Sequence, residues 1–403
     1  RVARDLALSA VHVNHQISPR AGEWELFCRA LCERRGIGIT VQRVDVVAAG
    51  SGIEAAARKL RYRAFATLEA DFVALAHHLD DQVETFLLQL LRGAGPKGLA
   101  GMPAIRPQKS VAGETDAPPP ILRPLLELRR SRLEAYAKSR GLSWVNDDSN
   151  GDSRFDRNYL RNELLVQLDA RFPGYRETLA RVARNLADYA LLAEELARID
   201  AQSLDRGAVS ADRLRQLSDA RALNLLRQLF ADQNLPMPPR VRLEEALRQC
   251  REAGRDAEIQ VAFGNARLRC YRDRVEVMVE AAELPADWQS RWDGLHELVL
   301  PDRLGVLRSR AVIGEGIARR FFEIRAATVR GRMGGERMQP GVNRPRRPLK
   351  SLLQEHGVPP WERSRMPLVF FGEQLAWVPG IGVAAEFRAG AAEPGIAPDW
   401  EPG

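Results

Sequence analysis

The chain has 403 residues, of which 45% are hydrophobic and 28% are charged, and this length exceeds the usual size of one compact domain. No run reaches the roughly 18 to 20 consecutive apolar residues of a membrane span, so we expect a cytoplasmic protein without a membrane partner. Lysine and arginine outnumber aspartate and glutamate by 60 to 53, a formal net charge of +7 that permits a polyanionic partner without identifying one. Four cysteines without any Cys-x-x-Cys pair argue against a disulfide framework and against zinc or iron–sulfur chemistry.

The first 165 residues alternate strand-like and helix-like patterns, which predicts an α/β domain with a doubly wound parallel sheet. The predicted strands and helices alternate in the order 6–13, 24–35, 37–47, 54–69, 72–76 and 80–92. A stretch rich in proline and glycine, 102–120, is interpreted as a surface loop. A further helix is predicted at 125–140, and the segment 143–145 could close the sheet.

Helix patterns continue from Asn158 to about Gln249, and the last of them covers 240–250. Strand-like runs follow at 266–279 and 297–312, and the region 321–387 mixes short strands with one helix at 349–356. The chain is therefore divided into an α/β domain, a helical domain and a small α+β C-terminal domain, with the bounds 1–165, 166–290 and 291–403.

The strongest local signal is a group of acids and histidines where a predicted strand gives way to a helix: His77, His78, Asp80, Asp81 and Glu84. Ligands of open α/β sheets bind beyond the carboxyl ends of the strands, which is where this group lies. Its acids are three or four residues apart and share one side of the first helical turn. One acid there would be explained by the helix dipole, but three acids with two histidines exceed that need. Carboxylates beside a nucleotide phosphate suit Mg²⁺, and we predict that Asp81 and Glu84 bind it.

A glycine-rich segment follows this helix, and Arg92, Gly93 and Lys97 within it could hold phosphate. It lacks the Gly-Lys-Ser/Thr ending of a Walker A loop, and a glycine-rich helix exit explains it about as well.

Two further sets of polar side chains suit contacts with phosphates and bases. One set is Arg154, Arg157, Asn158 and Arg161, and the other is Arg58, Arg61 and Tyr62. Taken alone, the first set is better explained as a solvated basic helix face and the second as the polar side of an ordinary amphipathic helix.

Taken together, these segments resemble the family of tRNA(Ile)-lysidine synthetases. The motifs in the first part of the chain are His12-Val13-Asn14-His15, Glu54-x3-Arg58-x2-Arg61-Tyr62, His77-His78-x-Asp80-Asp81-Gln82-x-Glu84-Thr85, Arg92-Gly93-x-Gly95 and Asp156-Arg157-Asn158-x2-Arg161. The C-terminal motifs are Gly334-Gly335-Glu336-Arg337, Leu349-Lys350-x2-Leu353-Gln354-Glu355 and Pro359-Pro360-Trp361-Glu362-Arg363.

The resemblance implies an N-type ATP pyrophosphatase fold for 1–165, followed by two tRNA-binding domains. It implies that ATP adenylylates O2 of the wobble cytidine of tRNA(Ile), and that free L-lysine then attacks C2 and expels AMP. ATP and Mg²⁺ are the implied cofactors, tRNA(Ile) and L-lysine are the partners, and a homodimer is a possible assembly.

The predicted site residues fall into three groups. The catalytic residues are Asp80, Asp81, Glu84 and Arg92. The ATP-binding residues are His12, Asn14, His77, His78, Gly93 and Lys97. The RNA-binding residues are Arg58, Arg61, Tyr62, Arg154, Arg157, Asn158, Arg161, Arg344, Arg346, Arg347, Lys350 and Trp361.

One departure from the family pattern concerns its first strand and Ser-Gly-Gly-x-Asp-Ser phosphate loop, which this sequence does not contain. We expect the chain to start inside or just after the first helix, with the strands at 6–13 and 72–76 either apart or in direct pairing. Two alternatives stay open: a tRNA-binding protein without catalytic activity, and a 2-thiocytidine-type tRNA thiolase. The thiolase would need Cys-x-x-Cys ligands, which are absent.

Overall fold

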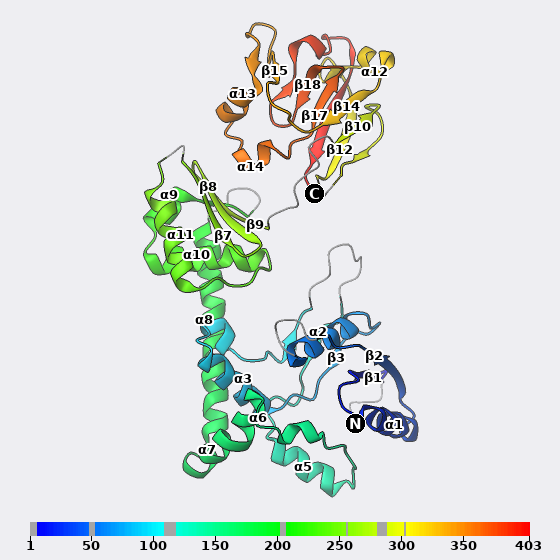
Figure 1. Ribbon diagram of the computed structural model, residues 1–403, viewed down its shortest axis with the longest axis vertical. Helices are drawn as coiled ribbons and strands as arrows, with labels where there is room; N and C mark the ends of the chain where they lie inside the picture. The colour runs from blue at the N-terminus through cyan, green and yellow to red at the C-terminus, as the bar shows by residue number, and fades with distance from the viewer. Residues whose placement is uncertain are drawn as a thin grey trace. The chain divides into compact units, whose positions relative to one another are not determined.

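The computed structural model describes residues 6–47, 53–108, 118–201, 207–254, 257–279, 288–301 and 304–403. The chain forms two compact units, Arg1–Glu195 and Leu196–Gly403 (Figure 1). No helix among the described residues is long and apolar enough to cross a membrane. The centre of the predicted loop at 102–120, residues 109–117, lies outside the described residues.

The first unit begins with alternating strands and helices and ends in a run of helices. Its strands are β1 (Ser9–Asn14), β2 (Gly38–Arg43), β3 (Val73–Ala74), β4 (Ile105–Arg106) and β5 (Ile121–Leu122). Its helices are α1 (Ala21–Arg34), α2 (Ile53–Ala66), α3 (Leu79–Leu91), α4 (Pro96–Leu99), α5 (Arg130–Ser139), α6 (Asp156–Tyr159), α7 (Leu165–Arg171) and α8 (Tyr175–Ala201). The predicted order of alternating elements is confirmed, with bounds shifted by a few residues.

The sheet of the first unit is divided into two pieces. β1 and β2 pair in parallel, and a separate sheet has the order β3-β5-β4, with β3 parallel and β4 antiparallel to β5. Among the described strands β1 does not pair with β3, so one of the two expected outcomes, separation, is confirmed. Both pieces contribute to one small apolar cluster around Phe65, Val73 and Ile121.

Two expectations for this unit were wrong. Residues 143–145 form no strand, so they do not close the sheet. The sheet instead gains β4, which lies inside the stretch 102–120 interpreted as a loop, and β5, which begins just after it. Each of these strands has two residues, too few for an alternating pattern to stand out in the sequence.

The segment from Asp156 to Arg171 is one helical run that changes type in its middle. A π-helical turn, Leu160–Leu164, separates α6 from α7. Such turns are rare and are frequent at functional sites. Leu165, just after the turn, is buried against Val83 of α3 and Tyr175 of α8, so this run is packed on α3.

In the second unit, the described residues from 207 to 279 form three helices and four strands. They are β6 (Val209–Ser210), α9 (Ala211–Gln216), α10 (Asp219–Asp232), α11 (Arg240–Glu252), β7 (Glu258–Phe263), β8 (Ala266–Tyr271) and β9 (Arg274–Val279). The strands form an antiparallel sheet in the order β6-β9-β8-β7. Leu226 and Phe230 of α10 share a core with Leu243 of α11 and Leu268 of β8. The predicted helical domain is therefore α+β at this point, and β6 and β7 are the strands that the prediction missed.

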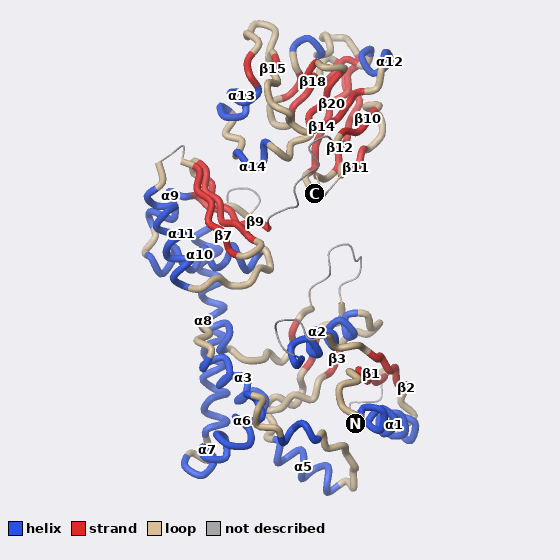
Figure 2. The backbone as a smooth tube through the Cα atoms, viewed as in Figure 1, coloured by secondary structure: helices blue, strands red, loops and turns tan. Residues whose placement is uncertain are grey.

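The C-terminal domain is mostly β-structure (Figure 2). Its strands are β10 (Gln289–Trp292), β11 (Leu298–Val299), β12 (Val306–Ile313), β13 (Ile317–Ala318), β14 (Ala327–Arg330), β15 (Arg337–Met338), β16 (Arg347–Pro348), β17 (Leu368–Phe371), β18 (Gln374–Val378), β19 (Gly382–Val383) and β20 (Pro394–Glu401). Its helices are α12 (Arg320–Ile324), α13 (Leu349–Glu355) and α14 (Pro360–Arg363). The helix predicted at 349–356 is confirmed.

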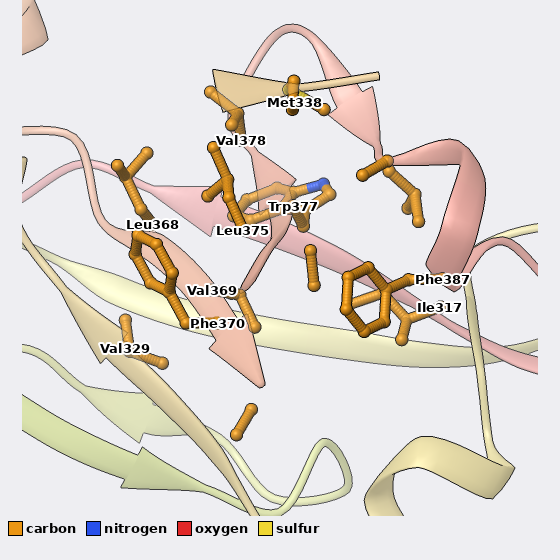
Figure 3. Packing of buried hydrophobic residues seen from close by; sticks show 14 of the residues in the cluster. Ile317, Val329, Met338, Leu368, Val369, Phe370, Leu375, Trp377, Val378 and Phe387 are labelled. Atoms are coloured by element: carbon orange, nitrogen blue, oxygen red, sulfur yellow. The ribbon is translucent and has the colours of Figure 1, made fainter. Parts of the chain in front are cut away.

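The strands of this domain form a five-stranded sheet, β10-β14-β17-β18-β19, a four-stranded sheet, β11-β12-β20-β13, and a separate pair, β15-β16. Side chains of both sheets meet in one core, where Ile317 of β13 lies near Phe387, and Val329, Phe370 and Trp377 come from the five-stranded sheet (Figure 3). β17 is apolar and buried at every position, and β18 is buried after its first residue, so these two strands lie inside the core.

Candidate active site

The start of α3 is held by a reciprocal cap between His78 and Asp81. His78 Nδ1 accepts from the backbone N–H of Asp81 at 3.4 Å, and Asp81 Oδ2 accepts from the backbone N–H of His78 at 2.9 Å. This arrangement satisfies two N–H groups that the first helical turn leaves free. His78 therefore has a structural role, and its predicted contact with ATP stays a prediction.

Two arginines of the helical run neutralise the acids of α3. Glu84 is completely buried: its Oε1 accepts from Arg161 Nε and its Oε2 from Arg157 Nε, both at 2.6 Å. Arg157 Nη2 also donates to Asp81 Oδ1 at 2.9 Å, and Arg161 Nη2 lies 3.5 Å from the same atom. The structure thus joins two motifs that are about 70 residues apart in the chain into one charge cluster. We call Asp81, Glu84, Arg157 and Arg161 the acid–arginine cluster.

The acid–arginine cluster does not fit a magnesium site on Glu84. Both oxygens of Glu84 are occupied by guanidinium groups, and Mg²⁺ would have to displace two positive charges that approach within 2.6 Å. Over the described ranges, no three His, Cys, Asp or Glu side chains are grouped closely enough to hold a metal ion. Glu84 therefore anchors two arginines, and its predicted metal role stays a prediction.

Asp80 lies outside this cluster, although it is the neighbour of Asp81. Its Oδ1 accepts from Arg176 Nε at 2.6 Å, and its Oδ2 accepts from the backbone N–H of Arg130 at 2.8 Å. Burial raises the pKa of Asp80, but the hydrogen bonds from Arg130 and Arg176 outweigh it and hold that pKa below its usual value. Asp80 therefore ties α3 to α5 and α8, which argues against a role in activating an amine.

His77 follows β3 and accepts a hydrogen bond from a buried arginine. Arg123 Nε donates to His77 Nδ1 at 3.3 Å. Because Nδ1 accepts, the ring proton of the neutral imidazole belongs on Nε2. Burial lowers the pKa of His77 to about 4; Asp81 raises it, whereas Arg123, Arg157 and Arg58 lower it further. His77 is therefore a neutral N–H donor near neutral pH.

We expect His77 to stay neutral at pH 5.5 in the folded chain. In the unfolded chain its pKa is about 6.5, so this group makes folding less favourable as the pH falls from 6.5 towards 4. Nitrogen NMR of histidine-labelled protein would follow its titration, because the chain has only six histidines and His77→Gln identifies the signal. A midpoint above pH 6 would contradict this assignment.

The glycine-rich segment after α3 is fastened to that helix by Gln82. The side-chain amide of Gln82 donates to Met102 O and accepts from Met102 N, both at 2.7 Å. Gly101 has a φ of +69°, and a Cβ there would lie 2.7 Å from Gln82 Oε1, so no larger residue fits beside this contact. Gln82 therefore fixes the path of the segment relative to the acid–arginine cluster.

The basic residues of this segment have acidic partners. Lys97 Nζ lies 2.6 Å from Glu194 Oε1, and Arg92 Nη2 lies 3.7 Å from Asp156 Oδ2. Gly93, with a φ of +70°, follows the C-cap of α3. The catalytic role of Arg92 and the ATP contacts of Gly93 and Lys97 stay predictions.

Of the two ATP-binding residues predicted on β1, Asn14 has a clear structural role. Asn14 is buried and donates to Glu25 Oε2 at 3.1 Å. Arg43, then Asn14, hold the pKa of Glu25 far below its usual range. Asn14 thus ties β1 to α1, whereas His12, also on β1, is only half-buried.

The predicted RNA-binding residues of the first unit lie in two segments, 154–161 and α2. Arg157 and Arg161 belong to the acid–arginine cluster, whereas Arg154 pairs with Asp152 at 2.7 Å on the surface. Asn158 donates to Asp152 O at 3.0 Å and shapes the turn before α6. Arg58, Arg61 and Tyr62 lie on α2, where Arg61 donates to His15 Nε2.

The predicted RNA-binding residues at 344–350 lie on the surface of the C-terminal domain. Arg344 and Lys350 are exposed, Arg347 Nη1 lies 2.6 Å from Glu355, and Arg346 lies 3.8 Å from Glu386. The segment is a turn and a short strand before α13, so the prediction that it is not helical is confirmed. Arg346 also lines a cavity of about 390 Å³, together with Arg330 and Arg337.

Trp361 is buried, unlike the other residues predicted to bind RNA. It is 7% exposed, and its Nε1 donates to Glu276 Oε1 at 2.6 Å. Its ring lies edge-on to Tyr271, whose hydroxyl accepts from Arg363 at 3.2 Å. Trp361 therefore joins α14 to β8 and β9, and its predicted RNA contact stays a prediction.

Sequence reasoning missed two arginines: Arg123, which donates to His77, and Arg106, which lies over the Tyr62 ring. Arg123 follows β5 directly, and Arg106 lies on β4. The usable signal was the charged residue after the apolar pair Ile121–Leu122, because a polar group at the end of a buried parallel strand marks a ligand-binding edge. The surrounding prolines and glycines obscured that strand.

Three models of known protein families match three parts of this chain. The PP-loop domain model matches residues 1–168, the TilS substrate binding domain model 210–276 and the TilS substrate C-terminal domain model 327–400. The tRNA(Ile)-lysidine synthase of Nitrosomonas europaea is 41% identical over 408 residues, covering 98% of this chain and 86% of the relative. That of Chromobacterium violaceum is 40% identical, covering 99% and 89%.

Two solved structures also match, but their likeness is too low to carry an argument. One is the U34-tRNA thiolase NcsA from Methanococcus maripaludis, with 18% identity and a TM-score of 0.36 over 45% of this chain and 62% of that one. The other is a TILS C-terminal domain, with 20% identity and a TM-score of 0.22 over 29% of this chain and all of that one.

The first matched domain places the chain among PP-loop proteins, a class that uses ATP. The relatives that align over nearly the whole chain identify the family within this class. The chain belongs to the tRNA(Ile)-lysidine synthase family, whose members are carbon–nitrogen ligases, and the resemblance carried by the sequence motifs is confirmed.

Proposed function

We propose that this chain joins L-lysine to C2 of the wobble cytidine in a tRNA(Ile), with ATP as the source of energy. In the first step cytidine O2 attacks the α-phosphorus of ATP, and pyrophosphate leaves. In the second step the lysine ε-amine attacks C2, the C2–O2 bond breaks, and AMP leaves with O2. The attacking amine loses a proton in this second step, so a base close to C2 must accept it.

The observation that carries this proposal is the acid–arginine cluster beyond the carboxyl end of β3. Arg157 and Arg161 use their Nε and Nη2 groups on Glu84 and Asp81. Their side chains are 26% and 23% exposed, and no described residue is bonded to either Nη1 group. These two Nη1 groups suit the negative charge that builds on the phosphates in the first step and on AMP in the second.

Asp81 suits the second step better than the other acids. Glu84 has no exposed surface and Asp80 is tied to α5 and α8, whereas the Asp81 carboxylate is 12% exposed. Free lysine has an amine pKa of about 10.4, so it must lose a proton before it attacks. We assign Asp81 to binding the ammonium group and accepting that proton. Nucleotide phosphates commonly carry Mg²⁺, and we assign any Mg²⁺ in this reaction to ATP rather than to Glu84.

The RNA surface is proposed to include residues in both units. Arg344, Arg346 and Lys350 are exposed in the C-terminal domain, and the neighbouring cavity contains Arg330 and Arg337. Guanidinium groups around a cavity suit a backbone phosphate. These residues would position the tRNA, because phosphate contacts fix orientation without identifying a base.

The test of this proposal is lysine-dependent release of AMP from ATP and tRNA(Ile). We expect Asp81→Asn to lower that rate by about a hundredfold or more, the usual contribution of a general base, with tRNA binding nearly unchanged. Glu134→Gln is the matched control, because Glu134 forms an exposed pair with Arg130 on α5. Normal turnover of Asp81→Asn would remove Asp81 from the mechanism. A wild-type chain that binds tRNA without releasing AMP would support the non-catalytic alternative.

A further inference from the structure

Three arginines from three different elements meet at the side chain of Tyr62. The guanidinium carbon of Arg106, from β4, lies 4.6 Å from the centre of the Tyr62 ring, and that of Arg58, from α2, lies 5.1 Å away. Arg123, which follows β5, donates from Nη2 to the Tyr62 hydroxyl at 3.4 Å. Arg58 Nη2 also donates to that hydroxyl, at 3.3 Å.

These three arginines have no acidic partner among the described residues. Arg123 is only 2% exposed, yet its donors are bonded to neutral acceptors: His77 Nδ1, Pro103 O and the Tyr62 hydroxyl. A buried guanidinium is costly unless a negative charge compensates it. Burial lowers the pKa of Arg123, and the nearby charges of Arg106 and Arg58 lower it further. The folded chain therefore maintains an uncompensated positive charge at this point.

The hydroxyl of Tyr62 adds a directed donor to this positive charge. It accepts from Arg58 and Arg123, so its two lone pairs are used and its own hydrogen is free to donate. No described residue accepts that hydrogen. The three arginines and the hydroxyl together present several donors to a single oxyanion, as guanidinium groups do when they bind phosphate.

The group of arginines at Tyr62 contrasts with the acid–arginine cluster. There, Arg157 and Arg161 are matched by Asp81 and Glu84, so those arginines have carboxylates to hold them in place. At Tyr62 the hydrogen bonds of Arg123 and Arg58 go to neutral acceptors instead of carboxylates. The difference indicates that the negative charge at Tyr62 comes from a bound molecule.

We propose that Arg58, Arg106, Arg123 and Tyr62 form a phosphate-binding site next to His77. Two substrates of the proposed reaction carry phosphate groups: ATP and the tRNA backbone. Which of the two supplies the bound phosphate is a question that rests on the proposed function. The binding of phosphate itself does not depend on it, because it can be measured without turnover.

The test uses the whole chain and pyrophosphate as the probe, titrated by calorimetry without divalent metal at low salt. Arg58→Ala and Arg106→Ala change side chains that are not fully buried, so both variants are expected to fold, and their melting temperatures check this. Each is expected to weaken pyrophosphate binding by about tenfold and the double variant by about a hundredfold, the usual effect of losing charge-assisted hydrogen bonds. Tyr62→Phe keeps the ring beneath the arginines and should weaken binding less.

The matched control is Arg140→Ala, because Arg140 lies 5.6 Å from the centre of the exposed Tyr136 ring on α5. This variant removes an arginine that is stacked on a tyrosine away from the proposed site. It removes the same charge as each of the two single variants. If pyrophosphate binding is absent in the wild type, or is the same in the double variant as in Arg140→Ala, the proposal is wrong.

Two further measurements identify the molecule that supplies the phosphate. If it is ATP, the variants weaken ATP binding and leave the salt dependence of tRNA binding unchanged. If it is the tRNA, ATP binding is unchanged, and the slope of the logarithm of the tRNA-binding constant against the logarithm of the salt concentration falls in magnitude by about 0.7 to 0.9 for each phosphate that a variant no longer neutralises. An effect on the KM of lysine alone would assign the site to a carboxylate and overturn the proposal. Weaker pyrophosphate binding in the variants of a chain that forms no lysidine would leave the site standing and reject the proposed function.

Discussion

Glu84→Gln is expected to lower the free energy of unfolding of the first unit by about 3 kcal/mol, a typical cost of breaking a buried ion pair. Glu84 has no exposed surface and receives three hydrogen bonds from Arg157 and Arg161. The neutral amide accepts with one oxygen only, so it leaves two guanidinium groups close together with part of their compensation removed. Urea denaturation of the variant and the wild type would measure the difference.

Two controls separate this effect from the loss of any surface charge. Glu134→Gln removes an exposed partner of Arg130 and should change the free energy of unfolding by less than about 1 kcal/mol. Combining Glu84→Gln with Arg157→Met should recover part of the loss, because one of the uncompensated charges is removed. A stability of Glu84→Gln equal to that of Glu134→Gln would contradict the anchoring role. Stabilisation of the wild type by millimolar Mg²⁺, absent in Glu84→Gln, would restore the metal assignment.

Trp361→Ala is expected to destabilise the second unit by about 3 to 5 kcal/mol, as truncation of a buried tryptophan usually does. Its indole fills the space between Tyr271 and Arg269 and donates to Glu276, which would keep only Arg274 as a partner. The variant should also uncouple the domain of β8 and β9 from the C-terminal domain. Calorimetry should then show a lower and broader transition for this unit.

Trp144→Ala is the control for this variant, because Trp144 is 47% exposed and its loss should cost little. Trp361→Ala also distinguishes the structural role from the predicted RNA contact. Unchanged stability together with weaker tRNA binding would show that the ring contacts RNA after all. A parallel loss of stability and of tRNA affinity would support the structural role.

The order of elements in the first unit could be predicted because their local patterns are strong. The helix expected at 80–92 is α3 at Leu79–Leu91, whose apolar spacing and N-terminal acids leave little ambiguity. The strand β7 could also have been predicted, because Ile259, Val261 and Phe263 alternate with Glu258, Gln260 and the small Ala262. The strong helical pattern of α11 just before it obscured this alternation.

The candidate site was predictable in its parts but not in their pairing. The sequence indicates that Asp81, Glu84, Arg157 and Arg161 are unusual, and it cannot show that a guanidinium, rather than Mg²⁺, lies on Glu84. That choice depends on contacts between residues more than 70 positions apart. Trp361 presents a related choice, because an aromatic residue in a basic motif suits either stacking on RNA or burial, and the sequence does not show which of the two applies.

The π-helical turn at Leu160–Leu164 restricts how this region can change during evolution. Arg157 and Arg161 lie on Glu84 before the turn ends, and Leu165 packs against Val83 after it. A π-helical turn holds about one residue more than an α-helical turn, so removing one residue inside the turn, after Arg161, restores a regular α-helix and leaves the segments on either side in their present orientation. Removing a residue from α6 would instead rotate Arg157 by about 100° away from Glu84, the angle of one residue in a helix of 3.6 residues per turn. We therefore expect single-residue deletions to be confined to the turn.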